Sequence, residues 1–120
     1  MGKFNSFEEI SSWQRARALN KKIYLLTDSE SFKRDFDLAR QIRRCSVFIS
    51  SNIAEGFERN TDKEFSQFLF IAKGSAGEVR SQLYLALDLN YITQEAFNEL
   101  YAEITEISKL LSGFIKYLNK

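Results

Sequence analysis

The 120-residue sequence contains no histidine and no proline, and it has a single cysteine. Without histidine, catalysis by Ser-His-Asp or Cys-His groups is excluded, as are histidine-containing zinc sites and the Glu-x-x-His di-iron site of helical bundles. No glycine-rich loop of the Walker or dinucleotide-binding type is present. We therefore expect a protein that is not an enzyme and that has no metal site and no cofactor.

A single cysteine cannot form an internal disulfide, and Cys45 lies in an apolar context that fits a small core residue in a reducing cytoplasm. The sequence has no run of 18 or more apolar residues, so it predicts no transmembrane helix. Its first residues, MGKFNSFEE, lack the apolar segment of a signal peptide. We expect a cytoplasmic protein with no membrane partner.

The absence of proline favours long uninterrupted helices, and four segments have apolar residues at every third or fourth position. Ser6 with Glu9 and Thr61 with Glu64 have the spacing of capping boxes, and Thr93 is a third candidate N-cap. Four helices joined by short connections predict an all-α fold, an antiparallel up-down-up-down four-helix bundle that forms one domain over residues 1–120. The predicted helices cover residues of about 7–28, 35–58, 62–89 and 94–118.

Some apolar residues are surplus to the core of a single bundle. The stretches FLFI (68–71) and LYLALDL (83–89) are apolar on several helix faces, and Val47 and Phe48 lie off the stripe of the second helix. A helix that is apolar on several faces is covered from more than one side, which predicts a homo-oligomer. The alternative is a monomer that exposes some apolar surface, as many proteins do.

Three of the four glycines within the predicted helices bear on how the helices pack. Gly74 and Gly77 each cost about 1 kcal/mol relative to alanine, which predicts the close approach of a neighbouring helix; a tolerated local weakness is the alternative. Gly56, in NIAEGFER, is predicted to let a neighbour come close near the end of the second helix.

The basic residues are concentrated in the first half of the chain. Residues 1–60 hold eleven Lys/Arg and eight Asp/Glu, a net charge of +3, whereas residues 61–120 hold six and eight, a net of −2. Clustered Lys and Arg bind backbone phosphates, so we expect a nucleic-acid-binding face on the first two helices. The alternative is a solvated face with intersubunit ion pairs to the acidic fourth helix, and the near-neutral pI of 7.8 weakens the nucleic-acid interpretation. The candidate phosphate-binding residues are Arg15, Arg17, Lys21, Lys22, Arg40, Arg43 and Arg44.

A polar stripe follows on the second helix, where Asn52, Glu55 and Arg59 recur at spacings of three and four. Glu78 lies at a matching position on the third helix. A carboxylate active site of Glu55 and Glu78 is conceivable, but it would have no histidine and no nearby nucleophile. We interpret these four residues as a structural hydrogen-bond network that sets helix register or subunit orientation.

Four stretches together resemble a known family: WQRA (13–16), QIRRCSVFISSNIAEGFER (41–59), FLFIAKGSAGEVRSQL (68–83) and LNYI (89–92). They are similar to the four-helix-bundle proteins of the 23S rRNA intervening-sequence type, in order and spacing over nearly the whole chain. The accessory protein of diversity-generating retroelements is a distant relative with the same bundle.

The resemblance implies a homopentameric ring of bundles without enzymatic activity, and a role in binding RNA or DNA. In the retroelement branch the ring partners a reverse transcriptase, a partner that the near-neutral charge of this chain disfavours. Relatives often have a proline, an acidic residue and a glycine between the first two helices, where this chain reads ESFKRDFDLA, and Cys45 replaces a usual alanine. These departures concern the shape of the connection.

Overall fold

The computed structural model describes residues 4–120, which fold into four α-helices and one short 3₁₀-helix. Within these residues there is no β-strand. The 3₁₀-helix η1 covers Phe7–Glu9, and the α-helices are α1 (Ser11–Thr27), α2 (Phe36–Phe57), α3 (Asp62–Asp88) and α4 (Gln94–Leu118).

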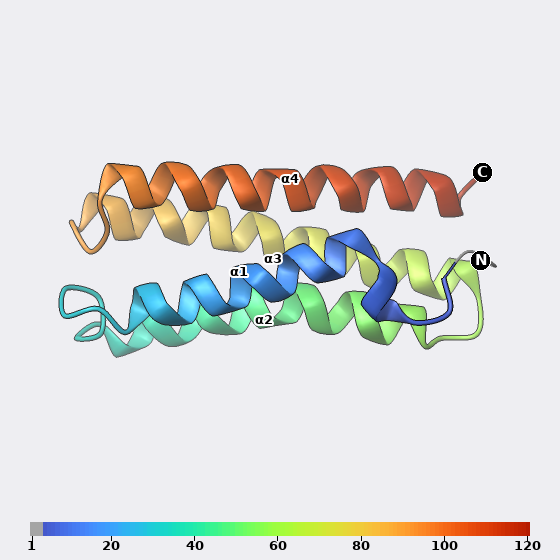
Figure 1. The fold of residues 1–120 in the computed structure, drawn as a ribbon, viewed down its shortest axis with the longest axis horizontal. Coiled ribbons are helices and arrows are strands. Elements are labelled where there is room, and N and C mark those ends of the chain that lie inside the picture. The colour runs from blue at the N-terminus through green and yellow to red at the C-terminus, as the bar shows by residue number, and fades with distance from the viewer. Residues whose placement is uncertain (1–3) are drawn as a thin grey trace.

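The four α-helices lie side by side along the long axis of a body of 45 × 20 × 19 Å (Figure 1). α1 packs on α2 and α4, and α3 packs on the same two helices. The α1–α2 and α3–α4 connections lie at one end, and the α2–α3 connection lies at the other, beside the C-terminus (Figure 1). None of the helices in the described residues is both long enough and apolar enough to cross a membrane.

The core is the stripe of apolar residues that the helical period predicts. On α2 the apolar residues at helical spacing, Leu38, Ile42, Cys45, Ile49 and Ile53, are all buried. On α1 Trp13 and Leu26 have the same spacing but are only partly buried. On α4 the last buried apolar residue is Ile115, and Phe114 and Leu118 are partly buried. Residues with no exposed surface include Leu19, Ile23, Ile42, Ile49, Ile53, Leu69, Leu83, Ile104, Ile107 and Leu111.

Threonine N-caps begin two of the helices as predicted. Thr61 Oγ1 accepts a hydrogen bond from the Glu64 N–H, and Thr93 Oγ1 accepts one from the Ala96 N–H, both at 3.1 Å. Each bond satisfies an N–H that the first helical turn leaves without a backbone partner.

The predicted start of the first helix is wrong. Ser6 makes no side-chain cap, and the Glu9 carboxylate instead accepts from the Asn5 N–H at 3.2 Å. Ile10 is extended (φ −79°, ψ 123°) and only 2% exposed, so α1 begins after it, at Ser11. Burial of the Ile10 side chain has prevailed over the local capping signal.

The glycines behave differently from one another. A Cβ on Gly56 would lie 2.7 Å from Phe68 Cβ and 2.8 Å from Phe65 Cδ1, so α2 and α3 approach closely there, as predicted. The same expectation for Gly74 and Gly77 is wrong within the described chain. A Cβ on Gly74 would have no neighbour within 4 Å, and on Gly77 only the tip of Arg80, at 3.8 Å.

Gly56→Ala is therefore expected to destabilise the fold, and Gly74→Ala is its matched control. Overpacking against Phe65 and Phe68 should cost about 1–3 kcal/mol. Gly74→Ala should stabilise by about 0.5–1 kcal/mol, because alanine is the better helix former in open space. Urea unfolding followed by circular dichroism measures both. Equal effects of the two substitutions would contradict the close approach at Gly56.

Candidate nucleic-acid interface

The seven predicted phosphate-binding residues lie in three places on the surface. Lys22 faces α4, three arginines lie on the first half of α2, and the remaining three residues lie on the exposed surface of α1. The structure therefore does not gather all seven into a single patch.

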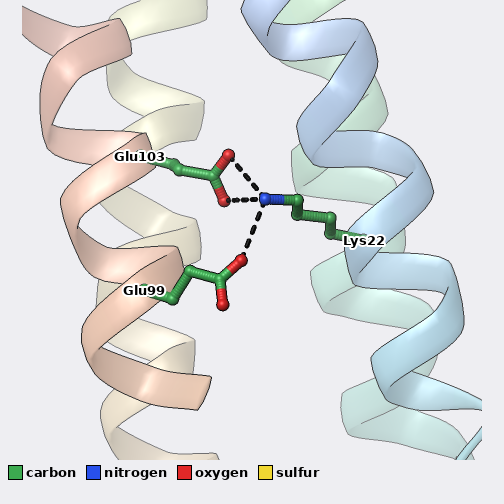
Figure 2. A network of polar contacts seen from close by, with 3 residues as sticks. All are labelled: Lys22, Glu99 and Glu103. Carbon is green, nitrogen blue, oxygen red and sulfur yellow. Dashed lines mark hydrogen bonds and ion pairs between the residues drawn. The ribbon is translucent and has the colours of Figure 1, made fainter. Parts of the chain in front are cut away.

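Lys22 forms an ion pair with two glutamates of α4 (Figure 2). Its Nζ lies 2.9 Å from Glu99 Oε2 and 3.0 Å from both carboxylate oxygens of Glu103. The hydrogen bonds to Glu99 and then Glu103 raise the pKa of Lys22. The lysine charge is thus compensated by α4 of the same chain. The alternative given by the sequence had placed such ion pairs between subunits.

Arg43 is held against the end of α1. Its Nε donates to Thr27 Oγ1 at 2.7 Å, and its Nη2 donates to the Tyr24 carbonyl oxygen at 3.4 Å. The guanidinium lies 4.5 Å from the centre of the Tyr24 ring, a cation–π distance. These contacts fix the arginine beside the α1–α2 connection.

The α1–α2 connection is itself anchored to the α3–α4 connection. Asp35 caps α2 by accepting from the Leu38 N–H at 3.0 Å, and its second oxygen accepts from the Tyr91 hydroxyl at 3.0 Å. This bond raises the pKa of Tyr91, because the phenol must keep its proton to donate. Ser31 Oγ donates to the Tyr91 carbonyl oxygen at 2.9 Å, and fully buried Phe32 packs on the Tyr91 ring at 5.2 Å. The residues that follow Phe32 are therefore positioned by buried contacts.

A basic hollow of about 470 Å³ lies at this end of the molecule, and we call it the connection-end hollow. Phe36 lies in its wall and is 74% exposed, the most exposed large apolar residue in the described chain. Lys33 pairs with Glu30 at 3.0 Å, whereas Arg34 and Arg40 have no ion pair within residues 4–120. Its lining residues are Thr27, Asp28, Lys33, Arg34, Phe36, Ala39, Arg40 and Arg43.

Arg40 also lines a second hollow, of about 240 Å³, with Asp37, Gln41 and Arg44. The basic surface therefore continues around the first turns of α2. Cations that can meet phosphates, together with an exposed ring on which a base can stack, are the two components of non-specific single-strand binding sites.

Arg15 and Arg17 lie away from this surface. Tyr24 and Thr27 are the α1 residues that contact Arg43, and Arg17 precedes them by seven and ten residues, which is about 10–15 Å of helix. Arg17 lies 5.9 Å from the Trp13 ring, and Lys21 is exposed on the same helix. Their contact with phosphate stays a prediction.

The four residues of the predicted polar network do not form one cluster within the described chain. Glu55 and Arg59 form an exposed ion pair at 3.5 Å, and Asn52 donates to the Phe48 carbonyl oxygen of its own helix at 2.7 Å. Within residues 4–120 no hydrogen bond joins Glu78 to these three residues. Their role in setting register or subunit orientation is still a prediction.

A partly buried polar network does join two helices, but through other residues. Asn20 of α1 accepts from Ser46 Oγ at 2.7 Å and donates to Ser50 Oγ at 3.0 Å. Ser46 is fully buried and Ser50 is 8% exposed. Serine at these positions gives no periodic signal in the sequence, because it is also common on solvated faces.

Cys45 is not arranged as a nucleophile. Burial raises the pKa of its thiol, and the negative charge of Glu78 raises it further. Gln82 Nε2 lies 3.8 Å from the sulfur. No group of three or more Cys, Asp or Glu side chains that could hold a metal ion occurs in the described residues.

The sequence interpretation omitted Phe36, Lys33 and Arg34 from the candidate site. Phe36 lies two positions before the first stripe residue of α2, Leu38, and between Arg34 and Arg40. An aromatic residue off the stripe and among arginines is the signal that could have identified it.

The described chain is thus a four-helix protein with a hollow lined by basic residues at the end that holds the α1–α2 connection. Residues 8–113 match the 23S rRNA-intervening sequence protein family, and the chain belongs to this family. The structure is similar to that of a protein of unknown function from the S23 ribosomal protein family of Bacteroides thetaiotaomicron VPI-5482, with a TM-score of 0.81 and 29% identity. The similarity covers 88% of this chain and 98% of that one. A search of curated proteins found no match.

Lys22→Gln is expected to reduce stability at neutral pH. Lys21→Gln, which removes an exposed neighbouring charge that has no ion pair within residues 4–120, should not. Because the folded-state pKa of Lys22 is raised, its contribution is complete below the ordinary lysine pKa of about 10.4 and is lost as pH rises through the raised value. Chemical unfolding of both variants from pH 7 to pH 11 measures this. A wild-type advantage over Lys22→Gln that does not decrease between pH 9 and pH 11 would contradict the ion pair as its source.

Proposed function

We propose that this protein is a non-enzymatic oligomeric scaffold that binds RNA or DNA through the basic surface of α1 and α2, with the connection-end hollow at its centre. The observation that carries the proposal is the position of Phe36, 74% exposed and in one hollow with Arg34, Arg40 and Arg43. Exposure of a large ring costs free energy in water, and among cations the ring suits a nucleobase whose phosphates meet the arginines.

Ribosomal RNA is the first nucleic acid to consider, since the matching family is named for the 23S rRNA intervening sequence. Non-specific phosphate contacts do not select one RNA, so the proposal extends to other RNA and to DNA. A reverse transcriptase partner is disfavoured by the formal net charge of +1. The lone cysteine fits a bacterial cytoplasm.

The proposal includes an antiparallel up-down-up-down bundle that assembles into a homopentamer. The alternating ends of the connections support the bundle topology (Figure 1). The outer surface of α3 supports assembly, because Phe70 and Ile71 are 55% and 52% exposed and Leu85 and Leu89 are each 46% exposed. In a ring, one hollow per subunit would gain avidity from repetition.

A structural or protein-interaction oligomer without a nucleic-acid ligand is the second candidate. The same exposed residues of α3 favour it, because an apolar surface binds protein and not phosphate. Nucleic-acid binding separates the two candidates.

Arg34→Gln/Arg40→Gln should weaken RNA binding. It should also reduce the slope of log affinity against log salt concentration by the amount that about two phosphate contacts contribute. Phe36→Ala should cost about 1–3 kcal/mol of binding to a single strand. The charge-matched control, Arg15→Gln/Arg17→Gln, removes the same charge from the far part of α1 and should have the smaller effect. Gel shifts of a structured rRNA fragment and a single strand from 50 to 200 mM salt measure these changes. If wild-type protein at micromolar concentration retains neither at about 50 mM salt, nucleic-acid binding is wrong.

Assembly is tested by light scattering coupled to size exclusion. The wild-type mass should be five times the 14.0 kDa of one chain. Ile71→Glu should lower that mass, because a charge would be buried between subunits. Leu25→Glu, the same change at a 66% exposed residue of α1, is the control and should leave the assembly intact. A wild-type mass of one chain would contradict the oligomer.

A further inference from the structure

A second basic region lies on the other half of the chain, in a groove of about 490 Å³ between α3 and α4. We call it the α3–α4 groove. Lys73 and Arg80 line it from α3, and Lys109 and Lys116 line it from α4. Each pair is spaced by seven residues, which places both members on one helix face about 10 Å apart.

The four cations of the groove have no acidic partner in the part of the chain that the structure describes. No Asp or Glu lines the groove, and none of the four forms an ion pair within residues 4–120. Lys22, by contrast, is bound by two glutamates. Four like charges around one groove repel each other, and a bound anion would relieve that repulsion.

Hydroxyl groups supply the second component of the groove. Thr105 and Ser108 line it just before Lys109, and Ser112 lines it between Lys109 and Lys116. In the described structure the Ser108 and Thr105 hydroxyl oxygens are buried without a hydrogen-bond partner, and Ser108 as a whole is 8% exposed. Native proteins rarely leave buried polar groups unsatisfied, and a hydroxyl that turns about one bond can donate to a ligand oxygen.

We propose that the α3–α4 groove binds a phosphate group, either free or as the phosphodiester of a nucleic acid. A phosphate offers several acceptor oxygens, so it can accept from serine and threonine hydroxyls while its charge is neutralised by lysines. The site stands independently of the proposed function, because its residues belong to the two helices that do not form the connection-end hollow.

The experiment is thermal unfolding with increasing millimolar phosphate, against chloride of equal ionic strength and pH. The melting temperature of the wild-type protein should rise and saturate, because a ligand that binds only the folded state stabilises it by mass action. Lys109→Gln/Lys116→Gln should lose this shift. Lys63→Gln/Lys120→Gln removes two exposed lysines that do not line the groove and should keep it. General stabilisation of proteins by phosphate does not saturate and acts equally on all variants.

Ser108→Ala separates binding from folding. Removal of an unsatisfied buried hydroxyl should leave the ligand-free protein at least as stable as wild type, and the shift with phosphate should be reduced. A reduced shift without loss of stability is the expected signature.

A short oligonucleotide in the same assay identifies the source of the phosphate. If the groove variant loses the shift with both ligands, the groove binds backbone phosphodiester; if it loses only the shift with inorganic phosphate, the ligand is a free phosphate compound. Arg34→Gln/Arg40→Gln should retain the phosphate shift, which separates this proposal from the connection-end hollow. The absence of a saturable shift with either ligand, or an equal shift in the groove variant, would overturn the proposal.

Discussion

Burial of one apolar stripe on each helix is the constraint on which the rest of the structure depends. Ile42, Ile49 and Ile53 have no exposed surface, so the rotation of α2 about its axis is fixed. At 3.6 residues per turn, that rotation also fixes the direction of every other side chain on the helix. Arg40 and Arg44 lie two positions on either side of Ile42 and must point to solvent. The basic surface is thus a consequence of how the core is packed.

The helices that local signals determine could be predicted from the sequence. The limits of α2, α3 and α4 agree with the prediction to within one residue, because periodicity and the N-caps Thr61 and Thr93 act over a single turn. The start of α1 could not be predicted in this way. There a capping-box pattern competes with burial of Ile10, and the neighbours that bury Ile10 are known only after the chain has folded.

Contacts between distant segments limit what could be predicted of the site. The ion pair of Lys22 with Glu99 joins residues 77 positions apart, and nothing local to Lys22 marks it as unavailable to a phosphate. The same limit applies to the glycines, since Gly56 and Gly74 have similar surroundings in sequence but only Gly56 lies against another helix. The cations of the α3–α4 groove were not predicted as a basic site for another reason. Their half of the chain has a net charge of −2, although the seven-residue spacing within each pair is visible.

The near-neutral total charge argued against a polyanion ligand, and the structure shows why this argument is weak. Surface charges farther apart than about 8 Å are largely screened at physiological salt, so a ligand meets the local charge. Glu99 and Glu103 lie on the side of α4 that faces α1, where they compensate Lys22. Lys109 and Lys116 of the same helix line the α3–α4 groove. No acidic residue of the described chain lines that groove. Opposite charges are therefore separated on two sides of one helix. A near-zero net charge of the whole chain is thus compatible with two strongly basic surfaces.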